Sequence, residues 1–327
     1  MRAAASDQRR VAVVGAPGAV GSQIVELLIE RGFPFSELKL FASPESAESS
    51  LEFNDQSYPI YPLSDPTDLS GFEVAFLAVP SSAASAIVRA RPGPLLIDLS
   101  AAGRAPSSGI PIAAPALTSR ERMIDLGHQP LIATPHPAAE VIAGIIKMLD
   151  LRSSVVCATL MLSASSRGKA EVADLISQSA DLLNARLDVE DDQTQIAFNL
   201  FADEQEAELT AAISAQVEEL LGYRAQLLLR VVRMPVLHGA GLSILVPAAA
   251  GAGSRDKLSA APGILLLEDE DPAGVIDAMS QEAICVSAKI EPAGVALWCV
   301  FDNARRAALS AIWIVESAMP GNSTMIN

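Results

Sequence analysis

The sequence predicts an α/β fold, in which a Rossmann-type doubly wound parallel sheet domain is joined to an α+β domain with a mixed sheet. In the first part of the chain, continuous apolar runs alternate with segments of helical periodicity, which is typical of buried parallel strands joined by helices. In the second part, strand-like runs follow one another across short connections, as in a mixed or antiparallel sheet. Of the 327 residues, 50% are hydrophobic and only 4% aromatic, a composition that favours α/β layers over a disulfide scaffold or a disordered chain.

The first region is expected to form the doubly wound sheet. Solid apolar runs mark its strands, and apolar residues three and four apart mark its helices. The predicted elements are a strand at Val11–Val14, a helix over 22–31, a strand at Leu38–Phe41, a polar loop at Ala42–Asp55, a strand at Val74–Val79, a helix at Ser81–Ala90 and a strand at Leu95–Leu99.

After the buried helix that ends at Leu149, the pattern changes to strand-like runs joined by short connections. The predicted elements are strands at Ser154–Leu162, Leu227–Val236, Gly241–Pro247, Ile264–Leu267, Ile284–Ile290 and Val295–Phe301, with helical segments at Gly168–Val189 and Ala202–Leu221. The last helix, Ala304–Met319, is expected to pack back on the first domain, with Arg305 and Arg306 on its solvated face. The predicted domains are therefore 1–131, completed by a terminal helix at 303–327, and 132–302.

A strand predicted at Leu131–Ala133, a rigid corner and a buried helix predicted from Ala138 to Leu149 follow one another around the stretch Ile132–Gly144. Pro135, His136 and Pro137 form the corner, and the helix that follows is apolar on nearly every side as far as Leu149. Such a helix N-terminus suits an anion or a developing oxyanion. However, the residues at its start, Pro137, Ala138 and Ala139, have no side chain that could act as a nucleophile.

The glycine-rich turn GAPGAVG, Gly15–Gly21, lies between a buried strand and a helix, which favours a dinucleotide site formed by Gly15, Ala16, Pro17, Gly18, Ala19 and Val20. A βα turn without a ligand is the alternative. Pro17 weakens the site because it removes one N–H group and restricts Ala16. After the next strand, Ser43 and Ser46 could hydrogen-bond a 2′-phosphate, whereas Glu45 would repel one. Both NADP and NAD therefore remain possible.

The charge and the cysteines exclude several classes of partner. The formal net charge of −16 disfavours nucleic acid and anionic membranes, and no apolar run is long enough to span a bilayer. The chain has three widely spaced cysteines, Cys157, Cys285 and Cys299, which fit no zinc pattern and predict reduced thiols in the core of a cytoplasmic protein. No metal site is expected.

Seven landmarks occur in the order of a known family. They are GAPGAVG at Gly15–Gly21, FASPES at Phe41–Ser46, IDLSAAGR at Ile97–Arg104, IATPHP at Ile132–Pro137, IAFN at Ile196–Asn199, VRMPV at Val232–Val236 and FDNARRAA at Phe301–Ala308. In them the chain resembles the aspartate-semialdehyde dehydrogenase family over nearly its whole length. The resemblance implies a Rossmann domain, NADP as cofactor, and pairing of two chains through the second domain.

The resemblance also identifies two departures. In the family a cysteine thiolate attacks the aldehyde and a histidine takes up the proton; a hydride then leaves for NADP and phosphate cleaves the thioester. Here the cysteine position is Pro137 and the histidine position is Ala240. The arginines expected to hold a substrate carboxylate or phosphate, Arg104 and Arg233, are present. His136 is the one candidate substitute, although an imidazole adduct does not replace a thioester.

Since one mechanism needs both lost residues, the sequence predicts a non-catalytic homologue that keeps a dinucleotide- or small-anion-binding fold and forms a homodimer. Two alternatives remain. One is an NAD(P)-dependent oxidoreductase that acts on an aldehyde in amino-acid biosynthesis with altered active-site residues. The other is an interaction protein that forms a heterodimer with an active homologue.

Overall fold

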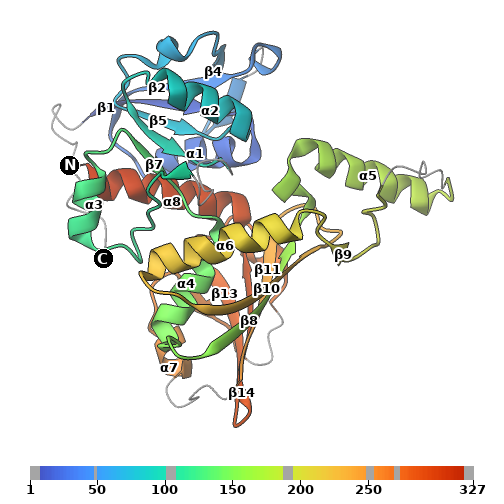
Figure 1. The fold of residues 1–327 in the computed structure, drawn as a ribbon. Coiled ribbons are helices and arrows are strands. Elements are labelled where there is room, and N and C mark those ends of the chain that lie inside the picture. Colours follow the sequence, from blue (N-terminus) through green and yellow to red (C-terminus); the bar gives the residue numbers. More distant parts are fainter. Residues whose placement is uncertain are drawn as a thin grey trace. The chain divides into compact units, whose positions relative to one another are not determined.

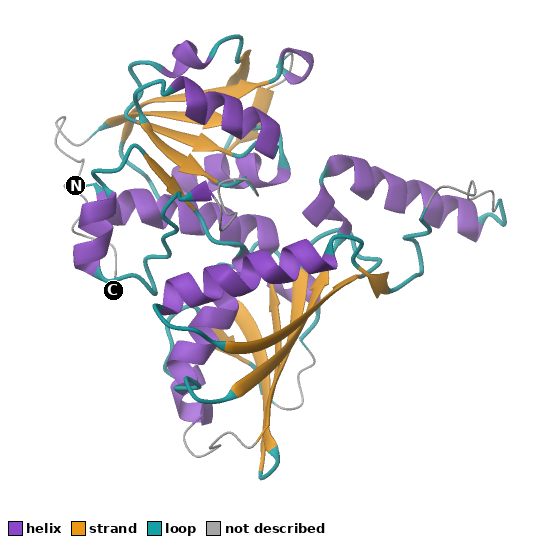
Figure 2. Ribbon diagram, in the orientation of Figure 1, coloured by secondary structure: helices purple, strands orange, loops and turns teal. Residues whose placement is uncertain are grey.

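The computed structural model describes residues 8–47, 50–100, 108–186, 194–247, 254–268 and 273–319. The chain divides into two compact units, Met1–His136 with Ala307–Asn327, and Pro137–Arg306 (Figure 1). Each unit contains one seven-stranded sheet with helices against it (Figure 2). Among the described residues, no helix is long and apolar enough to cross a membrane.

The sheet of the first unit has the order β3-β4-β2-β1-β5-β6-β7. Its strands are β1 (Arg9–Val14), β2 (Phe35–Ala42), β3 (Ser50–Phe53), β4 (Gln56–Pro62), β5 (Val74–Leu77), β6 (Leu95–Asp98) and β7 (Leu131–Ala133). All neighbours are parallel except the edge hairpin β3–β4. Parallel strands carry their ligands beyond their carboxyl ends, so the turn after β1 and the end of β2 are the positions of interest.

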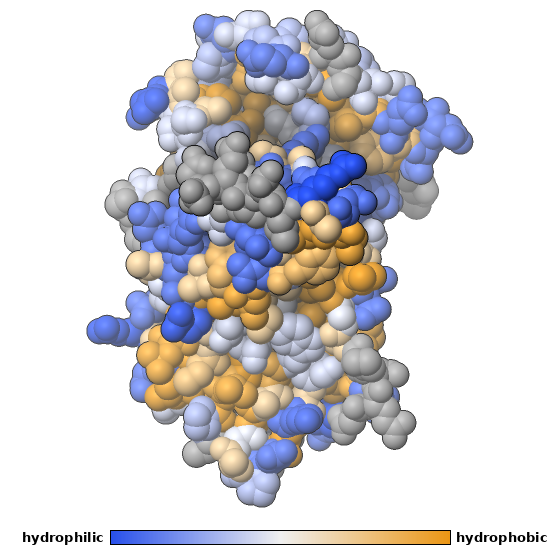
Figure 3. Space-filling view, turned by 90° about the vertical axis from the view of Figure 1, so that its right-hand side faces the viewer, coloured by the Kyte–Doolittle hydropathy of each residue, from blue (hydrophilic) through white to orange (hydrophobic). Residues whose placement is uncertain are grey.

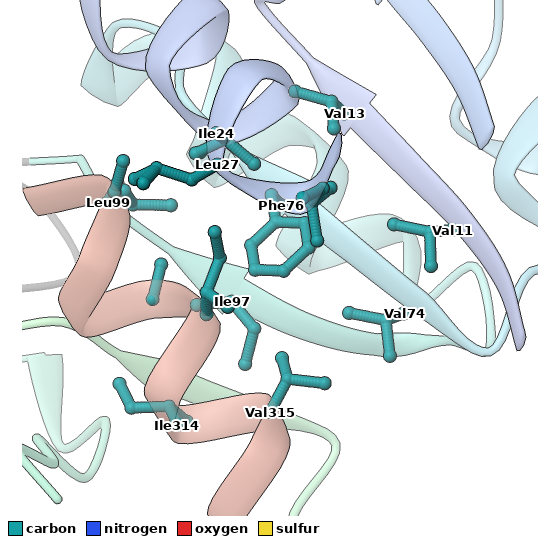
Figure 4. Close-up of a cluster of buried hydrophobic side chains, with 14 of the residues drawn as sticks. Val11, Val13, Ile24, Leu27, Val74, Phe76, Ile97, Leu99, Ile314 and Val315 are labelled. Atoms are coloured by element: carbon teal, nitrogen blue, oxygen red, sulfur yellow. The ribbon is translucent and has the colours of Figure 1, made fainter. Parts of the chain in front are cut away.

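Helices cover both faces of this sheet, which confirms the doubly wound architecture. On one face, α1 (Ala19–Glu30) and α8 (Asn303–Ala318) pack with residues such as Val11, Val13 and Phe76, and Ile314 and Val315 of α8 lie among them (Figure 4). On the other face, Ala84 and Ile87 of α2 (Ser81–Ala90) pack with Phe41 and Leu77. The strands are buried on both sides and therefore read as continuous apolar runs.

The prediction of a polar loop at Ala42–Asp55 was wrong. A 3-10 turn, η1 (Pro44–Ser46), follows β2, and β3 and β4 then form a hairpin closed at Asn54 and Asp55, whose φ angles are 49° and 60°. The hairpin was missed because an edge strand buries only alternate residues, here Leu51 and Phe53, while Ser50 and Glu52 face solvent.

The second unit has a mixed sheet of order β12-β13-β14-β11-β8-β10-β9, which confirms the predicted class. Its strands are β8 (Val155–Leu162), β9 (Phe201–Ala202), β10 (Gln226–Arg233), β11 (Ala240–Pro247), β12 (Ile264–Leu266), β13 (Ile284–Glu291) and β14 (Gly294–Phe301). The helices are α4 (Pro137–Leu149), α5 (Lys169–Leu183), α6 (Glu206–Leu221) and the short α7 (Ser254–Ser259). In the first unit, α3 (Arg120–Leu126) precedes β7.

Arg305 and Arg306 do not lie on a solvated helix face, so that prediction was wrong. Both side chains are buried at the start of α8. Arg306 Nη2 donates to Glu140 Oε1 of α4 at 2.7 Å, and both side chains of this ion pair are less than one-tenth exposed. Sequence periodicity missed the pair because Glu140 lies far from Arg306 along the chain and only the fold brings them together.

Candidate dinucleotide and anion sites

The turn between β1 and α1 is held by its own backbone. Gly15 N–H and Ala16 N–H both donate to Phe41 O, at 2.8 and 3.2 Å, and Gly18 N–H donates to Gly15 O at 2.9 Å. These bonds tie the turn to the end of β2. Since Pro17 has no N–H group, no donor remains in the turn itself.

Two glycines of the turn have no room for a side chain. A Cβ on Gly15, whose φ is +85°, would lie 2.2 Å from Ala78 O, and a Cβ on Gly21 would lie 2.1 Å from Gly15 O. Gly15 allows the turn to pack on the end of β5, and Gly21 allows α1 to start directly against the turn. These are the roles of the tight-turn and packing glycines in a dinucleotide-binding fold.

The donors available to a phosphate are at the start of α1. Gly18 is the N-cap of this helix and makes no side-chain capping bond. The N–H groups of Ala19, Val20 and Gly21 belong to the first helical turn, which has no acceptor within its own helix. The helix N-terminus also carries partial positive charge, so this arrangement fits a pyrophosphate.

The end of β2 places a carboxylate beside this turn. Ser43 lies just before η1, and its hydroxyl is 3.5 Å from that of Ser46. The fully exposed Glu45 lies between them. Its own backbone N–H and the Ser43 hydroxyl hydrogen-bond to its carboxylate and lower its pKa. Ser43 and Ser46, the expected ligands of a 2′-phosphate, therefore lie on either side of a negatively charged residue in the sequence.

The corner at the start of α4 has the predicted shape. β7 ends at Ala133, α4 starts at Pro137, and Pro137, Ala138 and Ala139 are buried. Proline is well suited to the first helical position because it has no N–H to leave unsatisfied. His136 is half-buried at the turn. No residue from Leu131 to Gly144, all of them described, carries a thiol.

Ala240 and Arg233 lie on either side of the same residue of the sheet, Leu162. Ala240 is the first residue of β11 and pairs with Leu162 of β8, and Leu162 pairs on its other side with Arg233, the last residue of β10. β10 was predicted to continue to Val236 but ends at Arg233, before Met234 and Pro235. His238 therefore does not belong to a strand and is exposed in the connection between β10 and β11.

Two carboxylates hold the guanidinium of Arg233. Arg233 Nη2 forms an ion pair with Glu171 Oε1, and its Nη1 lies 3.7 Å from Asp203 Oδ2. Arg167 Nη2 donates to the other oxygen of Asp203 at 2.6 Å. Burial, together with the positive charge of Arg167, lowers the pKa of Arg233 to about 10, so Arg233 remains charged at neutral pH.

This network was not predicted from the sequence. Arg233 was expected to bind a substrate anion, but two arginines and two carboxylates of the chain already balance one another there. A pocket of about 450 Å³ adjoins the network and is lined by residues that include Arg167, Glu171, Asp174, Gln178, Phe201 and Arg233. Arg104, the other predicted anion ligand, lies outside the described residues.

The three cysteines do not replace the missing thiol. Cys285 and Cys299 are buried, and burial raises the pKa of both thiols, that of Cys299 to about 12. Cys157 was predicted to lie in the core, but it is only half-buried, on β8 opposite Leu245. From Leu162 to Cys157 the strand advances roughly 16 Å at its usual rise per residue, so this thiol is remote from Ala240. Among the described residues, no group of three or more His, Cys, Asp or Glu could hold a metal ion.

Comparison with known proteins agrees with these features. A family model described as "Semialdehyde dehydrogenase, NAD binding domain" matches residues 10–125. A "USG-1 protein homolog" of Pseudomonas aeruginosa is 36% identical, with 95% of this chain and 98% of the relative covered. This chain belongs to the aspartate-semialdehyde dehydrogenase family. The family prediction from the seven landmarks is confirmed.

Proteins named as aspartate-semialdehyde dehydrogenases are also similar to this chain. An aspartate-semialdehyde dehydrogenase of Synechocystis is 29% identical, with 94% of this chain and 96% of that enzyme covered. The solved structure of a probable aspartate-semialdehyde dehydrogenase from Pseudomonas aeruginosa has a TM-score of 0.82 and 32% identity, and the match covers 94% of this chain and 98% of that one. The chain therefore shares nearly the whole length of these family members.

We expect the replacement of Glu171 by alanine to convert the Arg233 network into an anion site. The change leaves Arg233 with only the more distant Asp203, so the folded state should lose about 3 kcal/mol, the usual cost of breaking a buried pair. Phosphate or succinate should then raise the melting temperature of the variant in a concentration-dependent way and leave the parent unchanged.

The matched control for this experiment is Asp174→Ala, an exposed carboxylate on the same helix that also lines the pocket. It should change stability by less than about 0.5 kcal/mol and create no anion dependence. If the parent and Glu171→Ala respond equally to phosphate, Glu171 does not occupy the anion position of Arg233.

Proposed function

We propose that this chain is a non-catalytic member of the family that binds a dinucleotide in its first unit. The observation that supports dinucleotide binding is the glycine turn: the N-terminus of α1 has no side-chain cap, and Gly15 and Gly21 let the turn and the helix pack closely where a Cβ would clash. When bound, a nicotinamide dinucleotide would supply a hydride acceptor. The residues that would hold its pyrophosphate are Ala19, Val20 and Gly21.

The residues of this chain do not supply the chemistry that the family's reaction requires. The family's reaction needs a thiolate to add to the aldehyde carbon, so that hydride departure leaves a thioester that phosphate can cleave. Pro137 and Ala240 stand where the resemblance places that thiol and the base. Arg233, which would hold the substrate, is already paired with Glu171 and Asp203. Each of these three features opposes the reaction independently.

An assay of the purified full-length chain tests this proposal. With aspartate semialdehyde, phosphate and NADP or NAD, we expect no phosphate-dependent formation of reduced cofactor above background, with an active family member as the positive control. Calorimetry should nevertheless detect dinucleotide binding, with a dissociation constant below about 1 mM. Steady turnover that is lost in His136→Ala would overturn the proposal and favour an oxidoreductase with altered active-site residues.

We also propose that the second unit pairs with another copy of itself through the open face of its sheet. α6 packs on β10, and α4 packs on α6, so these helices cover one face. On the other face, on the neighbouring strands β8, β10 and β11, the side chains of Val155, Leu228 and Leu245 are 40%, 65% and 50% exposed. Figure 3 shows hydrophobic surface on the side of this unit that points to the right in Figure 1. Contiguous exposed apolar surface of this kind marks an interface.

The replacement Leu228→Glu should disrupt this pairing, because a charge would be buried at the interface. Analytical ultracentrifugation is expected to show a dimer for the parent and a monomer for the variant. Ile124→Glu, which introduces the same charge at an apolar position of α3 in the first unit that is 49% exposed, is the control and should remain dimeric. A monomeric parent that forms a complex only with an active homologue would instead favour the heterodimer alternative.

A further inference from the structure

We propose that the dinucleotide site selects NAD and rejects NADP, and that Glu45 makes this choice. The inference rests on the proposed dinucleotide binding. It differs from what the resemblance implies, since the family's reaction passes its hydride to NADP.

The backbone places Glu45 beside the cofactor turn. Gly15 N–H and Ala16 N–H both bind Phe41 O, which joins the turn after β1 to the last residues of β2. The segment that follows β2 is where a dinucleotide-binding fold contacts the adenosine ribose. In such folds a carboxylate there accepts hydrogen bonds from the ribose hydroxyls of NAD, whereas NADP needs a cation for its 2′-phosphate.

Hydrogen bonds within η1 shape the turn that carries this carboxylate. Pro44 is its first residue, and Ser46 N–H donates to Ser43 O at 2.9 Å, which forms the turn that carries Glu45. The Ser43 hydroxyl hydrogen-bonds to the Glu45 carboxylate, and this contact contributes to a lowered pKa. Glu45 is therefore ionised at neutral pH, and the Ser43 hydroxyl is used by the protein rather than left for a phosphate.

No cation in this segment compensates the charge. In the described stretch from Phe35 to Ala47, Lys39 is the only basic residue. Its Nζ lies 5.3 Å from the centre of the Phe41 ring and 4.8 Å from that of Tyr61, so the ammonium group is held over these two aromatic rings. A 2′-phosphate near η1 would meet a carboxylate, whereas a 2′-hydroxyl could donate to it.

Calorimetric titration of the full chain tests the inference with four probes: NAD, NADP, ADP-ribose and 2′-phospho-ADP-ribose. The last two lack nicotinamide, so the comparison between them reports the effect of the 2′-phosphate without any contribution from the nicotinamide. NAD and ADP-ribose should each bind at least about tenfold more tightly than their 2′-phosphorylated partners. In Glu45→Gln, the ratio of the two dissociation constants in each pair of probes should move closer to one. In Glu45→Arg, the 2′-phosphorylated probe of each pair should become the tighter ligand. Glu121→Arg, the same change of charge at an exposed position on α3, is the control and should leave both ratios unchanged.

The outcomes separate this inference from the proposal on which it rests. If NADP binds as tightly as NAD or more tightly, the NAD preference is wrong while dinucleotide binding stands. If none of the four probes binds at millimolar concentration, both are wrong. If the parent prefers NAD but Glu45→Arg does not change the ratio of the NAD and NADP dissociation constants, Glu45 is not the residue that determines the preference for NAD. Melting temperatures of the variants verify that each one is folded.

Discussion

Replacing Glu140 by alanine is expected to lower the free energy of unfolding by about 3–5 kcal/mol, because it removes the carboxylate from a buried ion pair with Arg306. Glu140 is only 3% exposed, and the 2.7 Å bond from Arg306 joins α4 to the start of α8. Such a loss is a large fraction of the stability of an ordinary domain. Urea denaturation followed by circular dichroism measures it.

Two further variants separate the lost pair from other effects of the substitution. The double variant Glu140→Met, Arg306→Met should be much more stable than Glu140→Ala, because it replaces both charges of the buried pair by apolar side chains. Lys147→Ala removes an exposed charge from the same helix and should cost less than about 0.5 kcal/mol. If Glu140→Ala and Lys147→Ala unfold at the same urea concentration, the buried pair does not stabilise the fold.

Replacing Gly21 by alanine is expected to weaken dinucleotide binding strongly. The new Cβ would lie 2.1 Å from Gly15 O and 2.8 Å from Ala16 Cα, and both of these are backbone atoms. The turn must therefore move away from α1, and the N–H groups of the first helical turn lose their arrangement. We expect the affinity for the dinucleotide to fall at least about a hundredfold, and stability to fall by about 1–3 kcal/mol, as is usual for overpacking.

Gly144→Ala provides the matched control, because Gly144 also lies in a helix but has nothing within 4 Å of a Cβ. Alanine is the better helix former, so this variant should be as stable as the parent or more stable by up to about 1 kcal/mol. Its affinity for the dinucleotide should not change. Equal binding by Gly21→Ala and the parent would show that the glycine turn does not hold the cofactor.

Local patterns were sufficient to predict much of the fold. The strand at Leu131–Ala133 was predicted and observed with the same bounds, and the buried helix predicted from Ala138 to Leu149 starts one residue earlier. Both succeed because burial on all sides produces an uninterrupted apolar run, which depends little on the partner. The hairpin β3–β4 failed because an edge strand buries too few residues to produce such a run.

The sequence predicted some features of the candidate sites and missed others. The structure has the predicted turn between β1 and α1, since its steric requirement is encoded within a few residues around Gly15 and Gly21. The partners of Arg233 were not, because Glu171 and Asp203 come from separate elements, and neither stands out in a chain with many acidic residues. The same reason explains why Arg306 was placed on the surface although Glu140 neutralises it inside.

The sequence by itself determined the family, the two kinds of sheet and the absence of a thiol at the corner before α4. These depend on residue identity and on spacing along the chain, which the sequence states directly. Only the tertiary structure decided which charges are already neutralised. Ion pairing acts over a few ångströms in space, and the fold brings Arg233, Glu171 and Asp203 together from distant positions. Arg233, which looks like a free anion ligand in the sequence, is thereby paired within the folded chain.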